Sequence, residues 1–254
     1  MSLLGPKVFP GFAKVNLYFR ILGSEIDYSG DKPDSKHLVE TLLYSLSLHD
    51  DVEINLDLGV SNEKEIVCEM NGVAGSKDID NSHNLAVLAA ELVLKCAKVK
   101  NYHLNININK NIPLGAGLAG GSSNAAAVIY GLHSLLPKNL QIAEDVLLEI
   151  TRKLGTDIAF AYLTTKNYFE KNQERTVAIG SHFGEIVQEV EGCVDLRLKT
   201  KTFSKGISTP LSYSTFDMDF PNKISNLNTE KNIQNLIKGL QCGDFKKVKS
   251  NLFN

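Results

Sequence analysis

Alternation of apolar and polar residues predicts three strands in the first half of the chain. Residues 15–21 and 51–56 alternate in this way, and so do residues 104–109. A period of two is that of a strand with one buried face. Between the first two strands, residues 24–35 are polar and contain glycine and proline, which predicts a loop. A further alternation at residues 195–199 predicts a strand late in the chain.

Four other stretches have apolar residues at helical spacing. Residues 84–96 show the i, i+3, i+4, i+7 pattern of an amphipathic helix. An alanine-rich helix follows the third strand and ends at Pro137, and residues 142–154 predict a helix with Gly155 at its C-cap. Residues 230–240 predict a last helix. Strands and helices intermingle without a regular βαβ rhythm, so the pattern predicts an α+β fold with a split core.

Composition and charge exclude several classes of protein. The chain has 254 residues, of which 43% are hydrophobic and 22% charged, enough for one large domain or two lobes with a boundary near residues 160–165. A net charge of −2 gives no general attraction to nucleic acid or to an anionic membrane. No apolar run is long enough for a signal peptide or a membrane span.

The cysteines and histidines do not indicate a metal site. Four scattered cysteines include no C-x-x-C pair, and six histidines show no paired metal-binding spacing. Scattered single cysteines are typical of reduced thiols. We therefore expect a soluble, cytoplasmic protein that binds neither nucleic acid nor membrane; the oligomeric state is not indicated.

The strongest chemical signal is residues 110–127, KNIPLGAGLAGGSSNAAA, between the third strand and the alanine-rich helix. Glycine tolerates positive φ and lets backbone N–H groups approach a ligand closely. The helix that begins here adds unpaired N–H donors and the positive end of its dipole. Together these features form a phosphate site, so the stretch predicts an enzyme that handles nucleotides.

Three better-known glycine patterns fit this stretch poorly. Gly115 to Gly120 formally reads G-x-G-x-x-G, but the second strand with its terminal acidic residue is missing. Gly121 stands where a Walker loop needs lysine, and the serines that follow lack the closing glycine of a nucleophile elbow. The remaining alternative is a glycine turn that serves only close packing of helix on strand.

Residues 113–126, PLGAGLAGGSSNAA, resemble the central ATP-binding motif of the GHMP kinases. The form GGSSNAA is similar to the branch whose members phosphorylate the 2-hydroxyl of 4-diphosphocytidyl-2-C-methyl-D-erythritol in non-mevalonate isoprenoid biosynthesis. Other similar segments are AKVNL at 13–17, KHLVETL at 36–42, LHD at 48–50, LGTDI at 154–158 and ISTPLSY at 207–213. In order and rough spacing these segments match that branch.

The resemblance implies a two-lobed α+β fold. Residues 1–162 would form an ATP-binding lobe like ribosomal protein S5 domain 2, and residues 163–254 a ferredoxin-like lobe. The family closes with another glycine-rich loop, whereas this sequence stops at residues 250–254 where the preceding segment would lie. We therefore expect an incomplete second lobe, in a shortened chain or a degenerate enzyme.

Phosphorylation of an alcohol needs a group that deprotonates or orients the hydroxyl, and positive charge beside the phosphoryl group. Asp157 is the candidate base, with Lys14 beside it, and the resemblance implies the same pair. The alternatives are a turn residue after a helix for Asp157 and a solvated surface charge for Lys14.

The resemblance also implies which residues bind ATP. They are Asn84, Lys110, Gly115, Gly117, Gly120, Gly121, Ser122, Ser123 and Asn124. Asn84 could equally be only the N-cap of the helix that follows it. Magnesium is expected with ATP because it neutralises phosphate charge, but the sequence assigns no ligand to it.

For the substrate, the resemblance places His37 on the cytosine and Asn16 near the erythritol part. Thr209 and Tyr213 belong to the matching I-S-T-x-x-x-Y segment, in which Tyr213 would stack on the base. Packing within the second lobe is the alternative for Tyr213.

Lys36 stands where the family usually has a tyrosine that forms a second platform for the base. We expect recognition of the base either to be weaker or to be rebuilt from Tyr28 or Tyr44. Two rival functions remain: a nucleotide-binding remnant without catalysis, and another GHMP kinase such as homoserine kinase.

Overall fold

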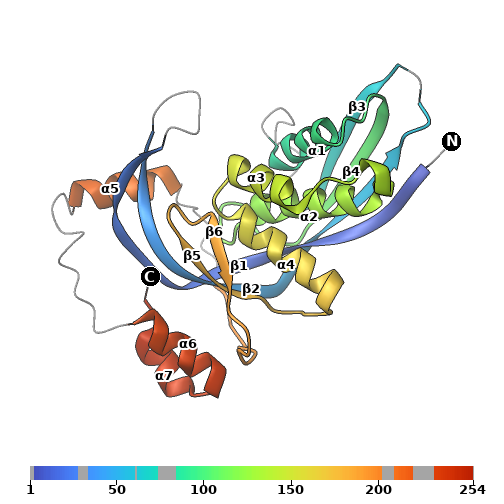
Figure 1. Cartoon of the computed structure of the whole chain (residues 1–254). Coiled ribbons are helices and arrows are strands. Elements are labelled where there is room, and N and C mark those ends of the chain that lie inside the picture. Colours follow the sequence, from blue (N-terminus) through green and yellow to red (C-terminus); the bar gives the residue numbers. More distant parts are fainter. Residues whose placement is uncertain are drawn as a thin grey trace.

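A six-stranded mixed sheet forms the frame of the molecule (Figure 1). The computed structural model describes residues 3–27, 34–60, 62–73, 84–201, 209–219 and 232–253. Its strands are β1 (Leu3–Asp27), β2 (Asp34–Asp57), β3 (Lys64–Gly72), β4 (Tyr102–Lys110), β5 (Val177–Ser181) and β6 (Ile186–Glu189). The order is β3-β4-β2-β5-β6, and β1 pairs with β2. Strands β3 and β4 run parallel, and the other pairs run antiparallel.

The β1–β2 hairpin is much longer than the alternation predicts. Its ladder extends from Leu3 opposite Asp57 to Asp27 opposite Asp34. The predicted loop at 24–35 is therefore wrong at both ends, where residues pair as strand. Among these residues, 24–26 and 35 are exposed and mostly polar, so they carry no apolar alternation, yet pairing with the opposite strand holds them without burial. Register shifts between Phe12 and Lys14 and again beyond Asn16 interrupt the ladder.

Four helices pack together on one face of the sheet (Figure 1). They are α1 (Leu85–Cys96), α2 (Gly120–Leu135), α3 (Glu144–Leu154) and α4 (Ile158–Lys171). The predictions of α1, α2 and α3 are confirmed, including the C-cap at Gly155. Helix α2 lies very close to the strands, because a Cβ on Gly131 would stand 2.6 Å from Ile54 Cδ1 and 2.8 Å from Phe9 Cδ2.

The pattern misses α4 and wrongly predicts a strand at 195–199. Helix α4 is buried on several sides, including Thr164 and Thr165, so its apolar residues do not form a stripe. Residues 195–199 have no regular structure. Here the Leu196 N–H donates to the Tyr44 hydroxyl at 2.8 Å, and the nearby Val194 N–H donates to the Leu240 carbonyl. Neither N–H group therefore pairs with the backbone of a neighbouring strand.

The C-terminal part contributes α5 (Thr209–Asp219), α6 (Ile233–Cys242) and α7 (Phe245–Asn251). Helix α6 confirms the prediction at 230–240. Its buried face, with Leu236 and Leu240, forms a second core with Tyr18 and Leu42 of the hairpin, separate from the core under α1 to α4. The predicted α+β fold with a split core is thus confirmed.

The division of the chain at residue 162 stays a prediction, and α4 continues through that position. Figure 1 shows α5 beside the hairpin, at the end away from α1 to α4. Among the helices of the described ranges, none combines the length and the apolar character that a membrane crossing needs.

Candidate active site

The glycine loop between β4 and α2 turns through three residues with positive φ. These are Gly115 at 64°, Gly117 at 71° and Ala119 at 59°. Helix α2 then begins at Gly120 with no side chain capping its N-terminus and no acidic residue in its first turn. Its first N–H groups and the positive end of its dipole therefore face outward uncompensated, which is the arrangement that binds phosphate.

The space around the two glycines that open α2 differs, so the absence of a side chain has a different explanation at each position. A Cβ on Gly120 would lie 2.9 Å from Lys110 Nζ and 3.2 Å from Ile112 Cγ2. A Cβ on Gly121 would meet only Leu85, at 3.9 Å, and Gly121 is exposed. Packing within the protein explains Gly120 but leaves Gly121 unexplained. An open helix N-terminus at Gly121 suits the close approach of a ligand.

The start of α2 is fastened to strand β1. The Ser123 Oγ lies 2.5 Å from the Phe12 carbonyl oxygen and 2.9 Å from that of Ala119, and its single hydrogen can be donated to either. Ser123 is fully buried, so its hydroxyl is occupied inside the protein. Asn124 is also buried, and its Oδ1 lies 2.9 Å from where a Cβ on Gly11 would stand. ATP contacts of Ser122, Ser123 and Asn124 stay predictions.

The predicted catalytic pair comes together in the structure. Lys14 Nζ lies 3.3 Å from Asp157 Oδ1 and donates to Asn16 Oδ1 at 2.8 Å. Asn16 in turn donates to the Thr41 hydroxyl at 2.7 Å, which bonds the Tyr18 carbonyl. This chain of hydrogen bonds fixes the Lys14 side chain, which is 10% exposed, beside an Asp157 side chain that is 36% exposed. Lys14 is therefore not a solvated surface charge.

Asp157 occupies the N-cap position of α4, directly after the turn at Gly155. The alternative from the sequence, that Asp157 lies in a turn after a helix, is thus right about its location. Its carboxylate, however, does not cap the helix and instead faces Lys14. An ionised acid that is held by a lysine and remains open to solvent can accept a proton from a bound alcohol.

A buried ion pair lies beneath the glycine loop, and the sequence reasoning missed its acidic member. Lys110 Nζ pairs with the fully buried Asp50, which also accepts the N–H groups of Asn111 at 2.7 Å and Ile112 at 2.8 Å. The one signal in the sequence is the LHD segment that ends in Asp50. Because Lys110 is buried and paired, its contact with ATP stays a prediction.

Asn84 is the N-cap of α1. Its Oδ1 accepts the Ala86 N–H at 3.0 Å, and its Nδ2 faces Cys68 Sγ at 3.5 Å. The N-cap interpretation is confirmed. A contact of the buried Asn84 with ATP stays a prediction.

His37 and Tyr213 stack on each other, with ring centroids 4.5 Å apart and planes 13° from parallel. His37 Nε2 also lies 2.7 Å from Asp217 Oδ1, a contact that the sequence reasoning missed. Burial raises the pKa of Tyr213, and so does the negative charge of Asp157. Of the predicted cytidine-binding residues, Tyr213 is therefore close enough to the predicted base to sense its charge. The side chain of Thr209 lies outside the described residues.

Of the two tyrosines expected to replace the missing platform, the structure tests only Tyr44. Lys36 places its ammonium 5.5 Å from the centre of the Phe183 ring. Tyr44 is fully buried and its hydroxyl accepts the Leu196 N–H, so its ring is not available as a platform. Tyr28 lies outside the described residues.

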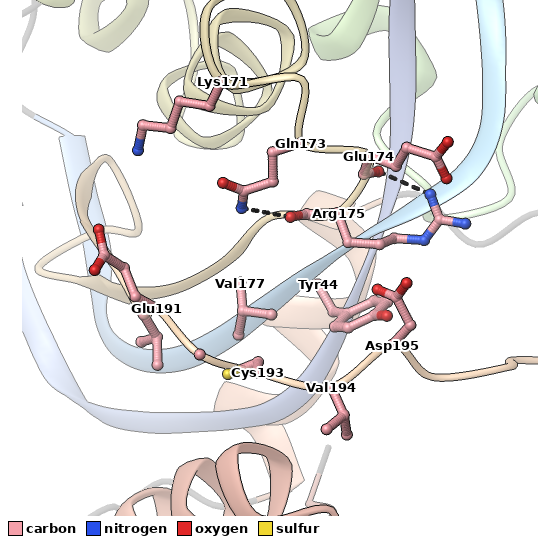
Figure 2. A pocket seen from close by; sticks show the side chains of 12 residues that line it. Tyr44, Lys171, Gln173, Glu174, Arg175, Val177, Glu191, Cys193, Val194 and Asp195 are labelled. Carbon is pink, nitrogen blue, oxygen red and sulfur yellow. Dashed lines mark hydrogen bonds between the residues drawn. The ribbon is translucent and has the colours of Figure 1, made fainter.

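A polar pocket of about 490 Å³ lies elsewhere, between the end of α4 and the segment after β6 (Figure 2). Tyr44, Val177 and Cys193 are among its lining residues, with Lys171 and Arg175. Figure 2 shows the Gln173 amide and the Arg175 guanidinium engaged with neighbouring backbone carbonyls. None of the residues predicted for catalysis or for ATP binding lines this pocket, so its size alone does not mark it as the active site.

Comparison with known proteins shows which family the chain resembles. Residues 84–165, which contain the glycine loop and Asp157, match the GHMP kinases N terminal domain. The chain is 29% identical over 243 residues to 4-diphosphocytidyl-2-C-methyl-D-erythritol kinase of Petrotoga mobilis, covering 96% of this chain and 80% of that enzyme. It is 31% identical over 241 residues to the enzyme of the same name in Prochlorococcus marinus strain MIT 9301, covering 93% and 67%.

Solved structures agree on the fold. A crystal structure of 4-(cytidine 5'-diphospho)-2C-methyl-D-erythritol kinase matches with a TM-score of 0.55 and 24% identity, over 93% of this chain and 72% of that one. A crystal structure of L. major mevalonate kinase matches with a TM-score of 0.55 and 13% identity, over 98% of this chain and 73% of that one.

The fold and the glycine loop together define a GHMP kinase, an enzyme that uses ATP to phosphorylate a small molecule. Within this class, the chain belongs to the family of 4-diphosphocytidyl-2-C-methyl-D-erythritol kinases.

Proposed function

We propose that this kinase transfers the γ-phosphoryl group of ATP to the 2-hydroxyl of 4-diphosphocytidyl-2-C-methyl-D-erythritol, with Asp157 as the base. One observation carries the assignment of the residues. The Lys14–Asp157 pair is joined to the glycine loop by the hydrogen bond from the Lys14 N–H to the Leu118 carbonyl, at 3.1 Å. Base, cation and phosphate site are thus parts of one connected structure.

The ATP phosphates bind at the start of α2. The uncapped N–H groups and the positive helix end attract the phosphates, and the exposed Gly121 lets them approach the backbone. Ser122 is half-buried next to Gly121 and is placed to add a hydroxyl donor. The left-handed residues before the helix shape the loop around the phosphates.

Asp157 accepts the proton of the substrate's 2-hydroxyl as the hydroxyl oxygen attacks the γ-phosphorus. The bond between that phosphorus and the bridging oxygen breaks, and ADP leaves with the electron pair. The Lys14 ammonium stabilises the negative charge on the transferring group, because it is held in place before the reaction and needs no reorganisation.

Magnesium is expected to arrive with ATP, coordinated mainly by phosphate oxygens. Within the described part of the chain, no group of three histidines, cysteines or acidic residues is close enough to hold a metal ion. Asp50 and Asp157 each lie beside a lysine.

The cytidine end of the substrate binds near His37 and Tyr213, and Asn16 lies next to Lys14 where the erythritol part would be. A cytoplasmic location is also part of the proposal. It is supported by the four cysteines, none of which forms a disulfide.

The test is ATP turnover by the purified chain with and without the cytidylyl substrate, with the phosphorylated product identified by mass spectrometry. We expect ADP and the 2-phosphorylated product in equal amounts, and no comparable product with homoserine or mevalonate. Tight ATP binding without any product would support the nucleotide-binding remnant instead.

A further inference from the structure

Three side chains on one face of α5 contact the imidazole of His37. Tyr213 stacks on its ring, Phe216 meets it edge-on with centroids 6.4 Å apart, and Asp217 contacts Nε2 at 2.7 Å. Tyr213, Phe216 and Asp217 have the i, i+3, i+4 spacing of one helix face. The His37 side chain is only 11% exposed, so its orientation is set by these contacts.

We infer that Asp217 is a specificity-determining residue that acts through His37 and selects cytosine over uracil. This inference rests on the proposed function, since it concerns the same substrate. Asp217 is a positioning residue here, because it contacts His37 and not the reacting atoms.

The contact determines which ring nitrogen of His37 carries the proton. A carboxylate can only accept hydrogen bonds, so Nε2 must donate to Asp217. In the neutral imidazole, Nδ1 then has a lone pair and acts as an acceptor. Within the described ranges, Nδ1 has no hydrogen-bond partner of its own.

An acceptor at Nδ1 distinguishes the two pyrimidines. Cytosine has an amino group, a donor, where uracil has a carbonyl oxygen, an acceptor. The cytosine amino group can donate to Nδ1. The uracil carbonyl oxygen cannot, and its lone pair would face the lone pair of Nδ1. A site that is built to pair one polar group discriminates against the analogue that leaves it unpaired.

Two measurements on the free protein test the inference without any phosphoryl transfer. The first is ¹⁵N NMR of His37, which reports the tautomer directly. We expect the Nε2–H form in the parent protein and loss of that preference in Asp217→Leu. A parent protein with the Nδ1–H form would overturn the inference even if every variant failed to fold.

The second measurement is calorimetric titration with CDP and with UDP. We expect the parent protein to bind CDP at least about tenfold more tightly than UDP, and Asp217→Leu to bring the two affinities within about threefold. Asp217→Asn should keep most of the preference, because its carbonyl oxygen still accepts from Nε2. Asp219→Leu, exposed at the end of the same helix, is the matched control and should leave the preference unchanged.

Equal losses of CDP and UDP affinity in Asp217→Leu would overturn the inference and would assign Asp217 only the task of holding α5 in place. An unchanged ratio would overturn it as well. Failure of the proposed function is a separate result: it would appear as a lack of phosphorylated product, while the CDP preference and the tautomer could still be measured.

Discussion

The backbone N–H of Lys14 donates to the carbonyl of Leu118 at 3.1 Å, while the side chain of the same lysine reaches Asp157. A single residue thus joins the glycine loop to the candidate base. The backbone bond does not depend on the side chain, so substitutions at Lys14 can separate the chemistry from the shape of the loop.

Lys14→Met is expected to lower kcat about 10²- to 10³-fold, since it removes a preorganised charge next to the transferring group. The affinity for ATP should change little, because the bond to Leu118 is kept. Steady-state kinetics and ATP titration check this. Lys7→Met, an exposed lysine on the same strand, is the control and should keep the parent kcat. A large loss of ATP affinity with kcat intact would contradict the role given to Lys14.

Gly120→Ala and Gly121→Ala should have different effects. The Cβ at position 120 would lie 2.9 Å from Lys110 Nζ, which is held by the buried Asp50 and has little room to move. We expect a loss of about 1–3 kcal/mol in the free energy of unfolding, measured by urea denaturation.

At position 121 the methyl group meets only Leu85 at 3.9 Å, so stability should be kept. The KM for ATP should nevertheless rise about tenfold or more, because the methyl group projects from the open helix N-terminus. If both variants kept the parent KM, the phosphates would have to bind elsewhere.

Lys110→Met leaves the buried Asp50 carboxylate without its cation. We expect this change to lower the free energy of unfolding by about 3–5 kcal/mol. The double variant Asp50→Asn, Lys110→Met should recover part of this loss, since no unpaired charge remains, and the two sites should be strongly coupled in a double-mutant cycle. Additive effects of the two substitutions would show that the pair is not a unit.

The thiol of Cys68 is expected to react slowly. Burial raises its pKa from the ordinary value of 9.0 to about 11, and the charge of Glu69 adds to the shift, whereas Cys96 and Cys242 are exposed. At about pH 8, Ellman's reagent should modify the two exposed thiols rapidly and Cys68 only on unfolding. Peptide mapping identifies the labelled residues.

The same shift makes a prediction for stability. The folded protein holds the Cys68 proton to higher pH than the unfolded chain does, so this contribution to stability is complete below pH 9.0 and is lost as the pH rises through about 11. Rapid labelling of Cys68 in the folded protein would contradict both statements.

Local patterns made much of the fold predictable. Helix α1 with its Asn84 cap, and α3 with its Gly155 cap, each carry a clear stripe and a terminal signal within a few residues. Helix α4 has no such stripe. Its threonines are buried, and Thr164 and Thr165 satisfy their hydroxyls by donating to the carbonyls of Phe160 and Pro10. The first bond lies within α4 and the second is a tertiary contact to β1, and neither leaves a periodic trace in the sequence.

The site was predictable to the extent that it lies in short motifs. The glycine loop and the segments around Lys14 and Asp157 could be recognised, and the structure places the two side chains 3.3 Å apart. Asp50 and Asp217 could not be assigned, because each owes its role to a partner far away in the sequence, Lys110 and His37. An isolated aspartate has no feature that reveals such a partner.

Asp157→Asn tests the central claim most directly. The amide keeps the size of the side chain but cannot take the substrate's proton, so product formation in a single turnover should fall about 10²- to 10⁴-fold. The dissociation constant for ATP, measured on the same sample, should stay within about threefold of the parent value. A variant that forms product at nearly the parent rate would contradict the assignment of Asp157 as the base.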